Sequence, residues 1–262
     1  MSLGLGRFHA RLVSGLFGAA CLTALVGCPN PNTYGTPRTV EPGKVSFTVA
    51  AEWEGYRFKE QETTTNGGNT QTVTASQSGS VVVPPTFLVR VGAADRLDFG
   101  FRANNMSSLG ADMKYNFVKS KFFDAAIDPG FQWFNVGVNV VHLHLPLLLA
   151  VNASKAVSIV LTPGIIYGTS SNNTVDNDLQ RAFGTTGLIG RAGVGLDLRF
   201  TPKFAVHPEV TFMRAFARDT TLNTDATMTY MFGIGFNFGH LPSYADTEDT
   251  EAAPAAAPAP AQ

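Results

Sequence analysis

The sequence has few cysteines, few charges and no long apolar run after its first residues. Its two cysteines, Cys21 and Cys28, lie near the N-terminus, so the chain after Cys28 can form no internal disulfide. Charged residues make up 15% of the chain, against roughly a quarter in a typical globular protein. A membrane helix needs about 20 consecutive apolar residues, and no later stretch supplies them. A disulfide scaffold and helical membrane spans are therefore excluded.

The chain also has no large excess of either charge, since it contains 19 Lys and Arg and 20 Asp and Glu. This balance gives no electrostatic reason to expect a nucleic acid as partner. The sequence contains no CxxC, phosphate-binding loop or HExxH motif, so it indicates no cofactor. We expect neither nucleic-acid binding nor enzymatic activity.

The N-terminus is typical of an export signal, and we assign residues 1–27 to it. Arg7 and Arg11 precede a short apolar run over residues 12–26. This run ends in Leu25-Val26-Gly27-Cys28, which resembles the lipobox of bacterial lipoproteins. The resemblance implies that Cys28 is acylated, for example with palmitate, and becomes the mature N-terminus. The alternative is an ordinary signal peptide with a chance cysteine.

The rest of the chain divides into three parts. Residues 28–43 are rich in Pro, Asn and Thr and are interpreted as a tether. Residues 44–239 alternate between apolar and polar side chains, which is the period of a β-strand. Residues 240–262 turn acidic and then Ala/Pro-rich, so we expect a disordered tail.

The alternating part contains about ten segments, most of them long enough for a membrane strand of about 9–11 residues. The segments span residues 44–58, 85–92, 95–104, 110–118, 122–134, 141–151, 157–168, 188–200, 204–216 and 227–238. Their connections are short at 93–94, 119–121, 152–156 and 201–203, and long at 59–80, 171–186 and 217–226. Short turns at one end (the turn end) and long loops at the other (the loop end) are typical of transmembrane barrels.

One face of each segment is almost purely apolar, and the other carries glycines and charges of both signs. We expect the charged side chains to form a network inside a closed barrel, together with Arg96, Asp98 and His207. Its members are Glu52, Glu54, Arg90, Arg102, Asp112, Lys114, Asp124, Asp128, Arg191, Asp197, Arg199 and Glu209. The opposite arrangement, apolar inside, would be a lipocalin-like barrel. Aromatic residues near both strand ends and glycines on the polar face favour the membrane barrel.

The last segment ends Gly233-Ile234-Gly235-Phe236-Asn237-Phe238, which resembles the terminal assembly signal of outer-membrane barrels. Gly233, Phe236 and Phe238 carry the match. With the alternating segments, the domain resembles the small bacterial outer-membrane β-barrel superfamily, OmpA-like or opacity-like. The resemblance implies an all-β, up-and-down antiparallel transmembrane barrel of about ten strands, with eight as the alternative, inserted by the barrel-assembly machinery.

Two pairs of polar residues are candidates for a metal-binding site. His142 and His144 share the polar face of one segment, and Asp128 on the preceding segment should lie at a similar height. Such a set can bind zinc or copper, but it can equally be a hydrogen-bonded part of the lumen. His207 and Glu209 form the second pair, with the same alternatives. The catalytic patterns of omptin proteases and lipid A deacylases are absent from the sequence.

The sequence thus predicts an outer-membrane lipoprotein with a structural or surface role, its acyl anchor on the periplasmic side. A narrow charged lumen would allow limited passage of small solutes or be filled by side chains. The alternative function is a lipocalin-like lipoprotein that binds an apolar ligand. Expected partners are outer-membrane lipids and the assembly machinery, with peptidoglycan or a surface ligand as further candidates. We expect a monomer.

Overall fold

The computed structural model describes residues 29–66, 69–104, 108–171, 178–217, 219 and 224–242. The predicted signal peptide, Cys28 and nearly all of the tail lie outside these residues. The strands and the helix are β1 (Val45–Asn66), β2 (Asn69–Ala94), β3 (Leu97–Asn104), β4 (Ser108–Lys119), β5 (Phe123–Ile127), β6 (Gly130–Asn135), β7 (Asn139–Asn152), β8 (Val157–Leu161), β9 (Gly164–Ser170), α2 (Asp178–Phe183), β10 (Gly187–Thr201), β11 (Phe204–Ala215) and β12 (Thr224–Gly239).

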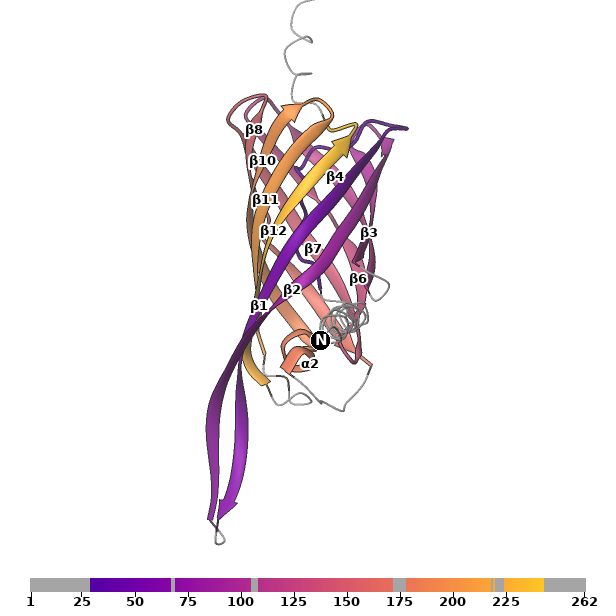
Figure 1. Ribbon diagram of the computed structural model, residues 1–262. Helices are drawn as coiled ribbons and strands as arrows, with labels where there is room; N and C mark the ends of the chain where they lie inside the picture. The colour runs from indigo at the N-terminus through magenta and orange to yellow at the C-terminus, as the bar shows by residue number, and fades with distance from the viewer. Residues whose placement is uncertain are drawn as a thin grey trace, which may run out of the picture.

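The strands form one closed antiparallel barrel (Figure 1). β5 and β6 both lie between β4 and β7, and they are two halves of one strand interrupted around Pro129. β8 and β9 likewise share the neighbours β7 and β10 and are interrupted around Pro163. Proline has no N–H to donate, so it breaks the ladder at these points. The twelve strand segments therefore make ten barrel strands, as predicted.

The barrel is closed because β1 pairs with both β2 and β12. Ser46 lies opposite Gly239 and Glu60 opposite Thr224, so the first and last strands pair over their common length. Each strand then has two neighbours, and no open edge remains to expose unpaired peptide groups to hydrocarbon.

One connection differs from the prediction. The sequence predicts a long loop over residues 59–80, but β1 and β2 continue pairing as far as Asn66 and Asn69. β2 pairs with β3 only from Thr86 onward, so the two strands extend beyond the barrel as a two-stranded ribbon at the loop end (Figure 1). This stretch contains many threonines, and β-branched side chains favour strands over loops.

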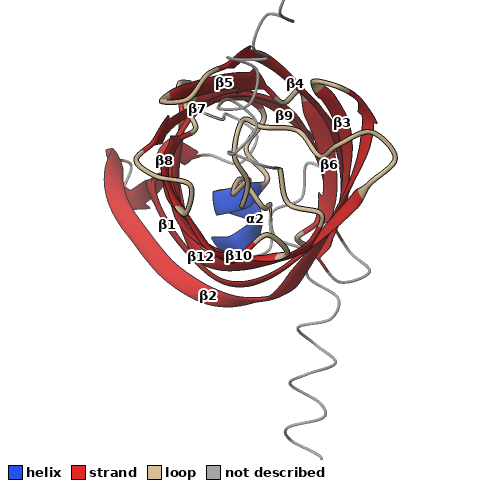
Figure 2. Ribbon diagram, turned by 90° about the horizontal axis from the view of Figure 1, so that it is seen from above, coloured by secondary structure: helices blue, strands red, loops and turns tan. Residues whose placement is uncertain are grey.

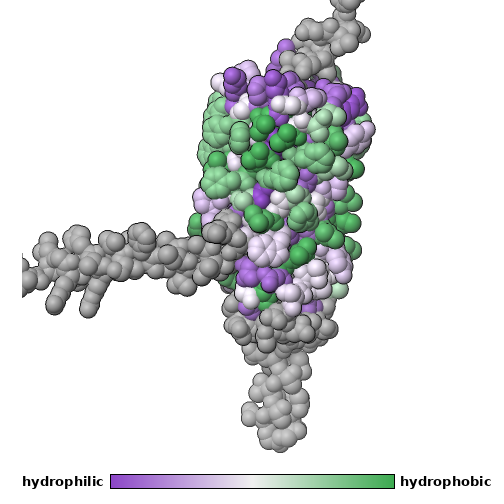
Figure 3. All heavy atoms as spheres, turned by 90° about the vertical axis from the view of Figure 1, so that its right-hand side faces the viewer, coloured by the Kyte–Doolittle hydropathy of each residue, from purple (hydrophilic) through white to green (hydrophobic). Residues whose placement is uncertain are grey.

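The apolar faces of the strands point outward, as predicted. Leu143 and Phe101 are 54% and 56% exposed, whereas Lys114 and Asp124 are 2% and 0% exposed. Figure 3 shows apolar side chains covering the middle of the barrel wall, with polar residues at the turn end. A lipocalin-like barrel would bury the apolar side chains, so this alternative does not fit.

Aromatic side chains gather at both rims of the apolar surface. Trp53 packs against Tyr230 at the loop end, with ring centroids 5.4 Å apart. Phe204 packs against Phe238 at the turn end, with centroids 5.2 Å apart. Rings at these two levels are typical of the interfacial girdles of membrane barrels. No helix in the part of the chain that the structure describes is long and apolar enough to cross a membrane.

Candidate functional site: the plugged lumen

The lumen contains part of the protein's own N-terminal region. Residues 29–40, called the lumen segment below, run through the barrel from the loop end to the turn end. Asn32, Tyr34 and Arg38 are only 0%, 1% and 2% exposed. Figure 2 shows this segment and α2 inside the ring of strands. The stretch interpreted as a tether from its sequence is thus largely a buried plug.

Glu209 on β11 holds the middle of the lumen segment. Its Oε2 accepts hydrogen bonds from the backbone N–H groups of Thr33 and Tyr34, at 2.9 and 2.7 Å. The Thr33 hydroxyl donates to the same oxygen at 3.2 Å. A carboxylate that accepts several N–H donors satisfies peptide groups that the segment cannot pair in a sheet.

Glu52 on β1 holds the same region from another side. It accepts hydrogen bonds from Asn30 Nδ2, the Tyr34 hydroxyl and Thr86 Oγ1, each at 2.6 Å. The Tyr34 phenol donates its proton in this bond, so it satisfies one oxygen of a carboxylate that is almost fully buried.

Toward the turn end the segment is held by charged wall residues. Arg38 Nε lies 2.8 Å from Asp124 Oδ2, and both side chains are almost fully buried. The Val40 N–H donates to Asp98 Oδ2 at 2.9 Å, and Lys114 Nζ donates to the Thr36 carbonyl oxygen at 3.1 Å. These contacts connect the segment to β3, β4 and β5. In the strand order around the barrel, these strands lie across from β11, which carries Glu209.

The wall carries its own ion-pair network between β2 and β6. Arg90 Nη2 lies 2.7, 2.8 and 3.2 Å from carboxylate oxygens of Asp98, Asp112 and Asp128. Asp112 also pairs with Arg102, at 3.2 Å. Gly100 leaves the necessary space, because a Cβ there would lie 2.3 Å from Asp112 Oδ1.

Arg96 was predicted for the lumen but lies exposed in the turn between β2 and β3, where the strand alternation ends. The other predicted lumen residues lie on the inner wall, but they do not form one continuous network. Asp197 pairs with Arg199 at 3.0 Å near the turn end, apart from the cluster around Arg90. His207 lies between Asp197 and Glu209, at 3.6 and 3.7 Å from their carboxylate oxygens. Glu54 is fully buried. Several wall carboxylates thus hold the lumen segment in addition to other wall residues, as Glu52 and Asp98 do.

The metal hypothesis finds no support in the geometry. His142 and His144 lie opposite Gln132 and Gly130 in the ladder, as the alternation predicts. The ring of His142 packs edge-on against Phe134, with centroids 4.8 Å apart. Asp128 is held by Arg90. Among the residues that the structure describes, no three His, Cys, Asp or Glu side chains converge as a metal site would require.

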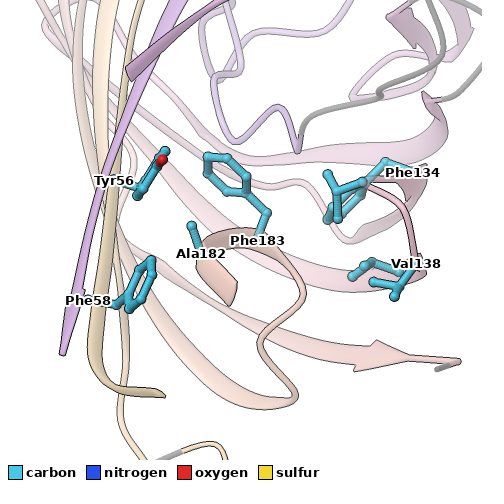
Figure 4. Packing of buried hydrophobic residues seen from close by; sticks show 8 residues of the cluster. Tyr56, Phe58, Phe134, Val138, Ala182 and Phe183 are labelled. Atoms are coloured by element: carbon cyan, nitrogen blue, oxygen red, sulfur yellow. The ribbon is translucent and has the colours of Figure 1, made fainter. Parts of the chain in front are cut away.

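The loop end of the lumen is closed by an apolar cluster. Ala182 and Phe183 of α2, with Leu179 against them, pack on inward-facing residues of β1 and of the β6–β7 hairpin (Figure 4). The wall residues of this cluster are Tyr56, Phe58, Phe134, Val136, Val138 and Val140. The sequence analysis placed these helical residues within a long loop. The Leu179, Ala182 and Phe183 spacing is the signal that could have identified the helix.

The predicted assembly signal lies at the end of the last strand. Phe236 and Phe238 point outward, 38% and 43% exposed, toward the lipid-facing surface. Gly233 points inward, and a Cβ there would lie 1.9 Å from the Tyr34 hydroxyl oxygen. Gly233 therefore has a packing role toward the lumen segment that the sequence did not reveal.

The fold and the lumen define the class of protein as a ten-stranded transmembrane β-barrel whose interior is occupied by its own chain. No protein-family model matches the sequence, and no curated relative matches it.

Several solved barrel structures have a similar arrangement. The outer-membrane protease OmpT of Escherichia coli matches with a TM-score of 0.47 at 8% identity, over 77% of this chain and 98% of OmpT. The translocator domain of the autotransporter NalP from Neisseria meningitidis matches with a TM-score of 0.43 at 10% identity, over 76% and 90%. Ail, the attachment invasion locus protein of Yersinia pestis, matches with a TM-score of 0.30 at 14% identity, over 75% and 99%.

Proposed function

We propose that this chain is a bacterial outer-membrane lipoprotein with a structural or surface role, whose barrel is closed at rest by the lumen segment. The observation that carries the proposal is the set of charge-assisted hydrogen bonds that residues 29–40 donate to the carboxylates of Glu209, Glu52, Asp98 and Asp124. Bonds of this kind are roughly twice as strong as neutral ones. The proposal contains no catalytic step.

The loop end supports the surface role. The β1–β2 ribbon extends beyond the barrel there, and α2 closes the mouth beside it. A two-stranded ribbon with free backbone groups on its edges suits a surface ligand that pairs as an additional strand. Nothing comparable supports peptidoglycan as a partner at the turn end.

The position of Pro29 bears on the lipid anchor. Pro29 lines a small pocket with Ala182 and Phe183 of α2, at the loop end. Pro242, near the start of the tail, lines a different pocket with Arg96 and Lys119 at the turn end. The sequence predicts the acyl anchor on the periplasmic side. The location of Pro29 instead supports an acyl group on Cys28 at the loop end, which is the extracellular end of such barrels.

Passage of small solutes then requires displacement of the lumen segment. The test is single-channel conductance in planar bilayers for the full chain, a variant lacking both residues 29–40 and α2, which covers the loop end, and a control lacking residues 63–72, of which 63–66 pair with 69–72 in the ribbon. We expect the full chain and the control to be silent and the first variant to conduct. Steady conductance by the full chain at the level of that variant would show that the segment does not close the barrel.

Acylation is tested separately. Cells fed labelled palmitate should incorporate the label into this protein, and Cys28→Ser should abolish incorporation. A labelled Cys28→Ser variant would contradict the lipobox assignment.

A further inference from the structure

A small polar cavity lies beside the lumen segment in the loop-end half of the barrel. Arg102, Arg191, His142 and His144 line it from the wall, and Asn30 and Thr33 line it from the segment. It has room for about one water-sized group. The cavity is therefore enclosed by positively charged and donor groups on several sides.

Arg191 is the unusual member of this set. Its side chain is buried, 6% exposed, and its Nη2 donates to the Thr162 hydroxyl at 3.1 Å. Within the part of the chain that the structure describes, no carboxylate lies within ion-pair distance of Arg191, and its Nε has no acceptor. By contrast, Arg38, Arg90 and Arg102 each lie within 3.2 Å of a carboxylate. Glu209 attracts Arg191 only from beyond ion-pair distance. A buried charge without a counter-charge in contact is unfavourable.

Two further polar atoms beside the cavity lack partners. The Nε of Arg102 and the Nε2 of His142 are buried and form no hydrogen bond with the described residues. The carboxylates that could have served them are engaged elsewhere. Asp128, which also lines the cavity, pairs with Arg90 at 3.2 Å, and Glu209 accepts the N–H groups of the lumen segment. The two guanidinium groups therefore have N–H donors without an acceptor, and the carboxylates of Asp128 and Glu209 are already engaged.

We propose that this cavity binds one small inorganic anion, of the size and charge of a halide. The anion supplies the counter-charge for Arg191 and accepts hydrogen bonds from Arg191 Nε and Arg102 Nε. His142 completes the site when its Nε2 carries the ring proton. Since Asn30 and Thr33 form one wall of the cavity, the bound anion also fastens the lumen segment to β10. The inference does not depend on the barrel's role as a pore or a surface protein.

The direct test is anomalous diffraction from crystals of the full barrel soaked in bromide. We expect a bromide peak beside the Arg191 guanidinium in the wild-type protein. In detergent at constant ionic strength, bromide or chloride in place of gluconate, which is too large to enter, should raise the midpoint of thermal unfolding by about 2–4 °C. Arg191→Gln should lose both effects, and the matched control Arg199→Gln, whose native arginine pairs with Asp197, should keep them.

Two results would overturn the proposal. One is wild-type protein with no bromide in the cavity and the same unfolding midpoint in chloride and gluconate, which would mean that the cavity holds water. The other is an Arg191→Gln variant that keeps both effects. If that variant does not fold, the wild-type diffraction and melting measurements decide alone.

Discussion

Tyr34 of the lumen segment lies directly over Gly233 of β12, at a place where no larger side chain could stand. A Cβ on Gly233 would lie 1.9 Å from the Tyr34 hydroxyl, and one on Gly235 would lie 2.9 Å from the Tyr34 Cβ. The two glycines form a recess in the last strand, and Tyr34 fills it. The Gly-Ile-Gly sequence therefore serves the plug, whether or not it also serves barrel assembly.

Substitution of Gly233 by Ala separates these two roles. The added methyl group must displace Tyr34, so we expect the free energy of unfolding to fall by about 1–3 kcal/mol. Adding Tyr34→Ala should relieve the clash, and a double-mutant cycle should show a coupling of about 1 kcal/mol or more. Urea unfolding in micelles measures it. An additive double variant would mean that Gly233 acts only through assembly.

Breaking the Arg38–Asp124 pair tests the turn-end attachment of the lumen segment. Arg38→Met leaves Asp124 buried without its cation, so the free energy of unfolding should fall by about 3 kcal/mol or more. The control is Arg96→Gln, because Arg96 is an exposed arginine whose nearest carboxylate is 3.9 Å away. The control should change stability by less than about 0.5 kcal/mol. Equal changes in the free energy of unfolding for the two variants would mean that Arg38 is not paired with Asp124 inside the barrel.

The orientation of the wall is tested by placing a charge on its outer face. Leu145 is 45% exposed and lies near the middle of β7, so Leu145→Arg should lower the free energy of unfolding by about 2–4 kcal/mol in lipid. Phe122, 69% exposed beside a turn-end connection, is the control. Phe122→Arg should cost about 0–1 kcal/mol, because its charge can reach the interface. Unfolding in vesicles measures both. The reverse order would mean that Leu145 does not face hydrocarbon.

The barrel could be predicted from sequence because the face on which a strand residue lies depends only on its neighbours in the chain. Alternation with period two gives each side chain its face, so Lys114 and Leu143 are assigned correctly from their neighbours alone. Alternation fails where the strand ends: Arg96, placed on the polar face, lies exposed in the turn between β2 and β3. The sequence does not predict the ribbon of β1 and β2, because the many polar residues there suggest a loop. Pairing between the two strands makes this stretch a ribbon.

The plug could not be predicted because its contacts join distant parts of the chain. Tyr34 and Glu209 are 175 residues apart, and neither the Pro/Asn/Thr-rich composition of the segment nor its lack of period indicates a buried position. The sequence predicts which acidic residues lie in the lumen, but it predicts basic residues of the wall as their partners. Thr33 and Tyr34 bind Glu209 through backbone N–H groups, which no side-chain pattern reports.

Amide hydrogen exchange, followed by NMR in micelles or nanodiscs, tests most directly that residues 29–40 occupy the lumen. The N–H groups of Thr33, Tyr34 and Val40 are each bonded to a buried carboxylate. We expect them to exchange as slowly as amides of the barrel strands such as β7. Exchange at the rate of an unstructured peptide, with the strands still protected, would contradict the plugged barrel.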